Sequence, residues 1–186
     1  MKKIPTLTIL VGCPASGKST FAEWKVRTEA KTMRISRDEI RFAQFQEVMD
    51  NSVESMISKI INVQIKTLLS NGWNVLLDTC NVKLDYIKQP IADFSEMANI
   101  EFKVFDLPLE ELFIRNEKRD RKVPKKVIEN MFYQLQKTKE KFDFKSVKKV
   151  EKNLEYCDQN PDLPKAIICD LDGTLALMNG RNPFDA

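Results

Sequence analysis

Apolar and polar positions along the chain form alternating blocks that predict strands and helices in turn. Short apolar runs predict four strands, at 6–11, 32–36, 73–79 and 100–108. Apolar residues at helical spacing predict helices at about 18–30, 37–49, 53–70, 83–97, 109–119 and 124–141. Strands that alternate with helices favour an α/β fold, in which a mainly parallel sheet carries helices on both faces.

The alternation weakens after residue 141. Residues 142–165 form a charged stretch that ends in DQNPDLP, and this composition predicts a linker with some helix. Residues 166–186 then begin with an apolar strand and a turn, AIICDLDGT. We therefore expect one domain over 1–141, a linker over 142–165 and the start of a second domain over 166–186.

Composition excludes some classes of protein. The apolar runs are too short to span a bilayer, and the lysine-flanked start leads into a glycine turn rather than a signal-peptide cleavage site. The four cysteines are far apart in the sequence, which fits reduced thiols in a cytoplasm. We expect a cytoplasmic protein without a membrane partner.

The chain contains no histidine, and this absence restricts the chemistry open to it. Any general base has to be a carboxylate, a lysine, a tyrosine or a cysteine. The small net positive charge does not by itself indicate a nucleic-acid partner. Its concentration in EKRDRKVPKK at 117–126 and in the lysines of 137–152 fits such a partner, although a solvated helix face explains most of these lysines equally well.

The segment GCPASGKST follows the first strand and matches the phosphate-loop pattern G-x-x-x-x-G-K-[ST]. Its glycines let backbone N–H groups wrap around phosphates, and the helix that follows adds partial positive charge. We expect Lys18 to reach the β- and γ-phosphates of ATP and the Ser19 hydroxyl to bind Mg²⁺. The ATP-binding residues expected here are Gly12, Cys13, Pro14, Ala15, Ser16, Gly17, Lys18, Ser19 and Thr20.

The segment SRDEIR at 36–41 has the residues of an acceptor site. Ser36 and Glu39 have the spacing of a helix cap, which places Asp38 in the first turn and Arg41 on the same face. Asp38 could accept a hydroxyl proton while Arg41 binds a phosphate of the acceptor. The alternative is an ordinary helix start, with a dipole-favoured aspartate and a solvated arginine.

Asp78 ends the third strand in LLDTCN, near the expected phosphate loop. It could hold the water shell of magnesium or orient the catalytic lysine or an arginine. The alternative is that Asp78 caps the next helix, a role for which Asn81 competes.

The segment RNEKRDRKVP at 115–124 joins two predicted helices with several basic residues. In nucleotide kinases such a segment forms a lid whose arginines neutralise the transferred phosphoryl group. Arg115 and Arg119 are four residues apart, so a continuing helix would place both on one face. A solvated loop is the alternative.

These motifs, in this order and together with KAIICDLDGTLALMNGRNPFD, resemble the phage polynucleotide 5′-kinase/3′-phosphatase family over essentially the whole chain. The resemblance implies transfer of the ATP γ-phosphate to 5′-hydroxyl ends of DNA or RNA. It implies catalytic roles for Lys18, for Asp38 as the general base, and for Arg119, which with Arg115 contacts the donor phosphates. The acceptor residues that we assign are Arg37, Asp38, Arg41, Asp78, Thr79 and Val123.

Within these assignments the resemblance gives three acceptor residues specific roles. Arg41 corresponds to the residue that binds the acceptor's 3′-phosphate, Asp78 to a second essential acid, and Val123 to the residue that stacks on the terminal base. The sequence departs from the family at Ser36, where an asparagine is expected, and in a shorter lid.

In that family a haloacid-dehalogenase-type phosphatase follows the kinase. DLDGT would supply Asp170 as nucleophile and Asp172 as general acid/base, but the chain has no room for the remaining catalytic groups. We therefore expect this segment to be an inactive remnant of a phosphatase. As partner we expect either a second copy of this chain, in a homo-oligomer, or a separate chain that carries the phosphatase. Two other functions stay open, a small-molecule P-loop kinase and an NTP-binding scaffold module.

Overall fold

The computed structural model describes residues 4–46 and 50–144. The expected linker beyond residue 144 and the expected phosphatase start, with Asp170 and Asp172, lie outside these residues. In chain order the elements are β1 Thr6–Gly12, α1 Lys18–Thr28, β2 Thr32–Ser36, α2 Arg37–Phe45, α3 Asn51–Ser70, β3 Asn74–Asp78, α4 Leu84–Phe94, β4 Asn99–Phe105, α5 Leu109–Glu117 and α6 Lys125–Lys141. The order and type of the predicted elements are confirmed.

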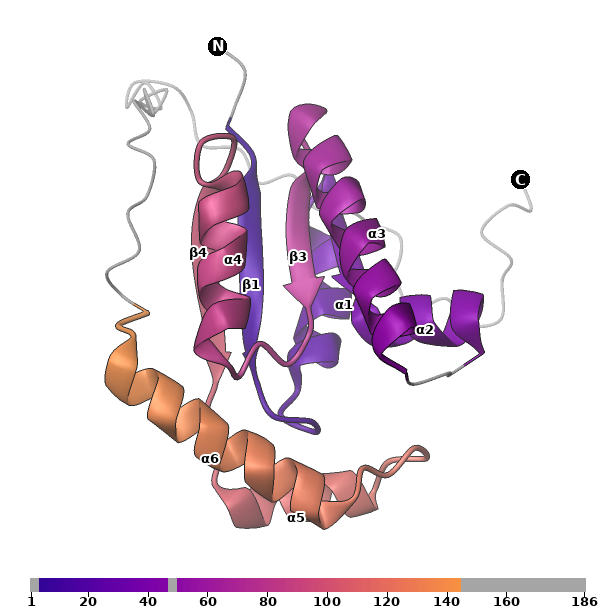
Figure 1. Cartoon of the computed structure of the whole chain (residues 1–186), viewed down its shortest axis with the longest axis vertical. Coiled ribbons are helices and arrows are strands. Elements are labelled where there is room, and N and C mark those ends of the chain that lie inside the picture. The colour runs from indigo at the N-terminus through magenta and orange to yellow at the C-terminus, as the bar shows by residue number, and fades with distance from the viewer. Residues whose placement is uncertain (1–3, 47–49, 145–186) are drawn as a thin grey trace, which may run out of the picture. The chain divides into compact units, whose positions relative to one another are not determined.

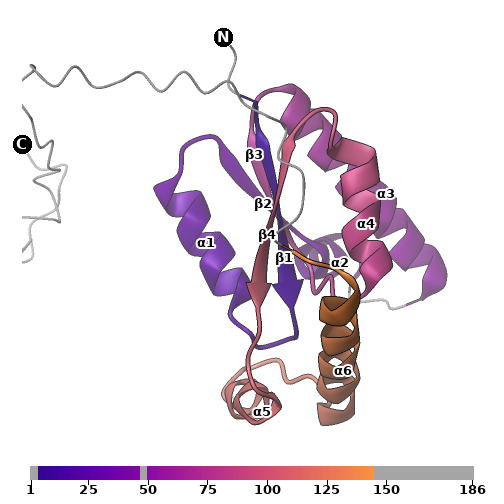
Figure 2. The same cartoon turned by 90° about the vertical axis from the view of Figure 1, so that its left-hand side faces the viewer.

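The four strands of the described residues form one parallel sheet in the order β2-β3-β1-β4. Every strand is followed by a helix, and this connection makes neighbouring strands parallel. Helix α1 covers one face of the sheet, whereas α3 and α4 cover the other (Figures 1 and 2). The expected α/β fold with helices on both faces is confirmed.

The two faces of the sheet differ in what they bury. Leu7, Ile9 and Val11 of β1 alternate onto the face under α3, where fully buried residues such as Ile57 and Ile65 complete the main core. The face under α1 has a smaller core, made by Leu10, Ala22 and Leu76 with Phe21 and Phe105 at its border. Most of the hydrophobic packing on the sheet is therefore on the face under α3.

Local chemistry sets the ends of the helices that matter for the site. The Ser36 hydroxyl accepts a hydrogen bond from the Glu39 N–H at 3.3 Å, so the predicted cap of α2 is confirmed. Asp50 caps α3 in the same way, through the N–H groups of Ser52 and Val53. Helix α3 ends at Ser70 and Asn71 caps it; Gly72 follows with a left-handed φ of 76° that favours glycine.

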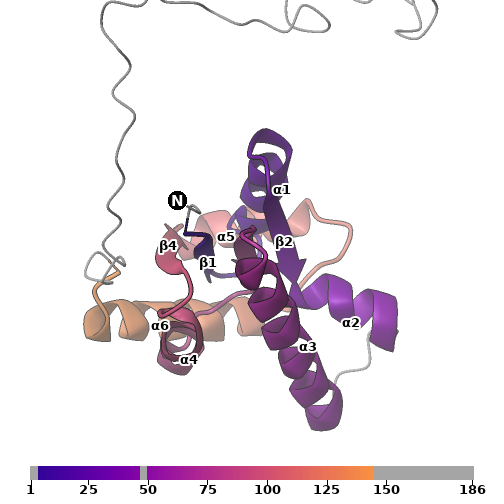
Figure 3. The ribbon, with the colours of Figure 1, turned by 90° about the horizontal axis from the view of Figure 1, so that it is seen from above.

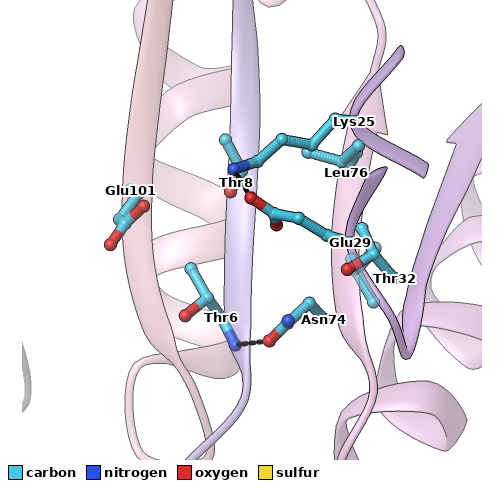
Figure 4. A pocket seen from close by; sticks show the side chains of 9 residues that line it. Thr6, Thr8, Lys25, Glu29, Thr32, Asn74, Leu76 and Glu101 are labelled. Atoms are coloured by element: carbon cyan, nitrogen blue, oxygen red, sulfur yellow. Dashed lines mark hydrogen bonds and ion pairs between the residues drawn. The ribbon is translucent and has the colours of Figure 1, made fainter. Parts of the chain in front are cut away.

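A cavity of about 230 Å³ lies between the α1 end and the strand starts (Figure 4). Its walls are mostly polar. Val75 and Leu76 are the apolar part, and the polar residues are Thr6, Thr8, Thr32, Asn74, Glu101 and the ion pair of Lys25 and Glu29. These residues are at the opposite ends of the strands from the phosphate loop. The cavity therefore contributes none of the predicted site residues.

Candidate active site at the carboxyl ends of the strands

The turn between β1 and α1 has the backbone of a phosphate-binding loop. A Cβ on Gly12 would lie 2.8 Å from the Phe105 carbonyl oxygen of β4, so only glycine fits at this position. Gly17 has a left-handed φ of 94° at the start of α1, and Ala15 has a φ of 64°. The Gly12 N–H donates to the Cys80 carbonyl at 2.9 Å, which ties the loop to the end of the neighbouring strand β3.

Lys18 is buried inside this loop. Its Nζ donates to the Cys13 carbonyl oxygen at 2.7 Å and to the Ser16 hydroxyl at 3.4 Å. Ser19 and Thr20, the next two residues, are exposed at the start of α1. The loop thus holds its lysine inward and leaves Ser19 and Thr20 exposed.

Asp78 ends β3 in a buried position beside the loop, and Arg34 of β2 holds it there. Arg34 donates to Asp78 Oδ2 from Nε at 2.8 Å and approaches it with Nη2 at 2.7 Å. Arg34 also pairs with Glu39 of α2, so one guanidinium joins two strands and a helix. Burial opposes the positive charge of Arg34, but the hydrogen bonds and charge of Asp78 raise its pKa above the ordinary value.

The alternative roles considered for Asp78 and Asn81 as helix caps are wrong. Helix α4 begins at Leu84, and its capping residue is Lys83, which makes no side-chain cap bond. Asn81 instead donates to the Leu10 carbonyl at 2.8 Å, and the Thr79 hydroxyl donates to the Asn81 side chain. Asn81 therefore joins the ends of β1 and β3.

Helix α2 brings Asp38 and Arg41 together, as the sequence predicts. Arg41 Nη1 lies 2.5 Å from Asp38 Oδ1, and Arg41 Nε donates to Glu54 of α3 at 2.7 Å. Arg37 donates to the other oxygen of Glu54 at 3.0 Å and to Ser58 at 2.9 Å. Arg41 is buried, whereas the side chain of Asp38 is 73% exposed.

This pairing fixes the charge states of α2 and α3. The hydrogen bond to Glu54 raises the pKa of Arg41 above its ordinary value, although burial opposes it. In return, the hydrogen bond from Arg41 lowers the pKa of Glu54 below 4.5, again against the effect of burial. Glu54 thus carries a negative charge that neutralises part of the two arginines.

The basic segment after α5 differs from the prediction in one respect. We expected a helix through residue 119 with Arg115 and Arg119 on one face, but α5 ends at Glu117 and Arg119 lies in the following turn. The reason is local: the Arg119 N–H bonds to the Asn116 carbonyl at 3.2 Å, which tightens the last turn and stops the helix. The expectation of a shared helical face is therefore wrong.

Asn116 also binds the backbone of the segment that follows α5. It is buried, accepts from the Val123 N–H at 3.0 Å and donates to the Val123 carbonyl at 2.8 Å. Val123 is half-buried against the main core. Arg115 extends from α5 so that its Nη1 lies 3.9 Å from where a Cβ of Gly17 would be, directly beside the phosphate loop.

Cys80 follows β3 next to the phosphate loop, where its carbonyl accepts the hydrogen bond from the Gly12 N–H. Burial raises the pKa of Cys80; the charges of Asp38 and Asp78 act in the same direction, and those of Lys18 and Arg119 oppose them. The pKa of Cys13 is raised to about 11, again chiefly by burial, with the charge of Lys18 opposing. Both cysteines are free thiols.

Sequence reasoning missed three residues that organise this site. Arg34 follows the alternation of β2, and this pattern alone indicated nothing about Asp78. Glu54 and Asn116 sit inside helices without a motif. Of the three, only Arg34 could have been noticed in the sequence, because a charged residue inside a short strand of a parallel sheet needs a partner of opposite charge.

The chain matches the family model of the AAA domain over residues 7–138. It is similar to the "Putative bifunctional polynucleotide kinase/RNA ligase" of Autographa californica nuclear polyhedrosis virus, with 29% identity over 206 aligned positions that cover 98% of this chain and 27% of the viral protein. It is also similar to the "L-seryl-tRNA(Sec) kinase" of Methanococcus maripaludis, with 30% identity over 74% of this chain and 52% of that protein.

Among solved structures the fold is similar to a chain in "Structure of the Pnkp1/Rnl/Hen1 RNA repair complex". The TM-score is 0.72 and the identity 45%, and the match covers all of this chain and 62% of that one. The chain thus spans less than two thirds of each of these three relatives. No helix in the part of the chain that the structure describes is both long and apolar enough to cross a membrane.

Proposed function

The chain belongs to the AAA domain family, and on that premise we propose that it is a polynucleotide 5′-hydroxyl kinase that transfers the γ-phosphate of ATP to 5′-OH ends of DNA or RNA. The observation that carries the proposal is that the loop around buried Lys18, the buried Asp78 that ends β3, and Asp38 in the first turn after β2 all lie at the carboxyl ends of adjacent parallel strands. In open parallel sheets this edge is where ligands bind. The names of two relatives, a polynucleotide kinase/RNA ligase and an RNA repair complex, support the same activity.

On the donor side, the loop 12–20 would hold the phosphates of ATP. The left-handed Gly17 allows backbone N–H groups at the start of α1 to face an anion, and α1 adds its positive N-terminal end. Lys18 would exchange its bonds to the loop for bonds to the phosphates. Arg115, beside Gly17, and Arg119 would neutralise the charge that develops during transfer.

On the acceptor side, Asp38 would accept the proton of the 5′-hydroxyl. As the hydroxyl oxygen bonds to the γ-phosphorus, the bond from that phosphorus to the β-γ bridging oxygen breaks and ADP leaves. The carboxylate of Asp38 is accessible, because most of its surface is exposed. No histidine competes for this role.

The remaining acceptor residues would position the strand. Arg41 would bind the 3′-phosphate of the terminal nucleotide, held in place by Glu54, which Arg37 holds from the other side. Asp78 and Thr79 would close the site at the end of β3. Val123, fixed by Asn116, would contact the terminal base.

A divalent cation fits this donor set. Ser19 is an exposed residue of the loop at the start of α1, and Mg²⁺ is commonly bound by one or two protein oxygens together with substrate phosphates. Bound there, Mg²⁺ would neutralise charge on the transferred phosphate. Ser19 is the residue that we assign to it.

Phosphate transfer separates this proposal from the alternatives. The chain is incubated with γ-labelled ATP and Mg²⁺ and offered a 5′-OH RNA, a 5′-OH DNA or small hydroxyl compounds such as gluconate. The proposal expects label on an oligonucleotide and none on the small compounds. Label only on a small compound would indicate a small-molecule kinase, and ATP binding without any transfer would indicate a scaffold module.

A further inference from the structure

Phe42 exposes an aromatic ring on α2 next to the proposed acceptor residues. Its side chain is 66% exposed, although phenylalanine is usually buried. The other aromatic residue of this helix, Phe45, packs against the main core, so packing explains Phe45 and leaves Phe42 unexplained. A single exposed aromatic residue is ordinary on a protein surface, and what distinguishes Phe42 is its position.

That position is one helical turn from the proposed general base. Residues four apart in a helix lie on the same face, so Phe42 follows Asp38 about 6 Å along the axis of α2. Arg41, the proposed ligand of the 3′-phosphate, is its immediate neighbour in the chain. Helix α2 leaves the end of β2 and runs away from the sheet, so Phe42 lies farther out than Asp38 (Figure 3).

We propose that the ring of Phe42 is a stacking platform for the base of the second nucleotide of the acceptor strand. The proposal rests on the proposed function, because it assumes that a 5′-OH end reaches Asp38. A strand bound with its 5′ end at Asp38 and its first 3′-phosphate at Arg41 continues outward along α2. The next base then meets the exposed ring of Phe42.

Stacking suits this place physically. Every base has a π-face, so an aromatic platform binds a strand without regard to sequence, in DNA and in RNA. A kinase that acts on ends of any sequence needs such contacts, whereas a base-specific hydrogen bond would restrict its substrates. Glu54 neutralises part of the positive charge of Arg37 and Arg41, which weakens their attraction for the acceptor strand. Uncharged contacts such as stacking must then supply more of the binding free energy.

The test is a cycle of protein and acceptor variants. KM for the acceptor is measured with wild type and Phe42→Ala, using a 5′-OH oligonucleotide with all bases, the same oligonucleotide abasic at position 2, and a nucleoside 3′-monophosphate. We expect Phe42→Ala to raise KM about 5- to 150-fold for the complete oligonucleotide, the range that base–aromatic stacking supports. For the abasic acceptor and the mononucleotide, KM should be the same in both proteins.

Two further variants serve as controls for the role of the Phe42 ring. Phe42→Trp keeps an aromatic face and should keep the low KM, whereas Trp24→Ala removes another exposed ring, 56% exposed on α1, and should change nothing. An equal rise of KM with all three acceptors, or no rise with any, would overturn the role of Phe42 and leave the kinase function intact. Failure of wild type to phosphorylate any oligonucleotide would instead overturn the proposed function, and the platform with it.

Discussion

Arg34 contacts one carboxylate oxygen of Asp78, Oδ2, through two nitrogens, Nε at 2.8 Å and Nη2 at 2.7 Å. This contact joins the middle of β2 to the end of β3, where the proposed donor and acceptor sites meet. Both side chains are largely removed from water, so each needs the other to offset the cost of burying its charge. The pair therefore fixes the position of Asp78, the acidic residue beside the phosphate loop.

Replacing Arg34 tests this contact. Arg34→Met leaves the buried charge of Asp78 without its partner and should lower the free energy of unfolding by about 3 kcal/mol. Urea unfolding followed by circular dichroism measures this loss. The double variant Arg34→Met/Asp78→Asn removes both charges and should recover part of it, so a double variant that is less stable by the full sum would contradict the pairing.

Lys18 and Asp38 should separate donor binding from acceptor chemistry. Asp38→Ala should lower the rate of transfer about 10²–10⁴-fold with ATP affinity unchanged, since it removes only the general base. Lys18→Ala should abolish transfer and weaken ATP binding as well. Single-turnover transfer and ATP titration of each variant give the two quantities, and near-full activity of Asp38→Ala would refute its assignment.

Arg41 should matter only for acceptors that carry a 3′-phosphate. Arg41→Ala should cost about 1.5–3 kcal/mol in transfer to a nucleoside 3′-monophosphate, the strength of a hydrogen bond to a charged group. The unphosphorylated nucleoside is the internal control, because any loss of packing at this buried position affects both acceptors. Equal losses in kcat/KM for the two would exclude the phosphate contact.

The acid stability of the domain should depend on Glu54. Its pKa is lowered in the folded protein, chiefly by the hydrogen bond from Arg41, so the ionised form contributes stability. That contribution is complete above the ordinary value of 4.5 and is lost as pH falls through the lower folded pKa. The Tm difference between wild type and Glu54→Gln should therefore shrink on acidification below this value. A constant difference down to pH 3 would contradict the coupling.

The sequence predicted the elements well because each depends on nearby residues. Apolar periodicity located the strands, and Ser36 located the start of α2, since a cap bonds only three residues away. It failed at Arg119, because the end of α5 depends on a turn around Asn116. The partners of Asp78 and Arg41 could not be predicted either, because Arg34 and Glu54 reach them from other elements across the fold.

The most direct measurement of the proposed function locates the phosphate after transfer. The chain is incubated with γ-labelled ATP and one oligonucleotide in two forms, with a 5′-hydroxyl or a 5′-phosphate, and the products are digested to mononucleotides. Our account predicts label only with the 5′-hydroxyl form, only on its terminal nucleotide, and none with Asp38→Ala over the same time. Label at another position, equal labelling of both forms, or ATP hydrolysis without labelling would contradict it.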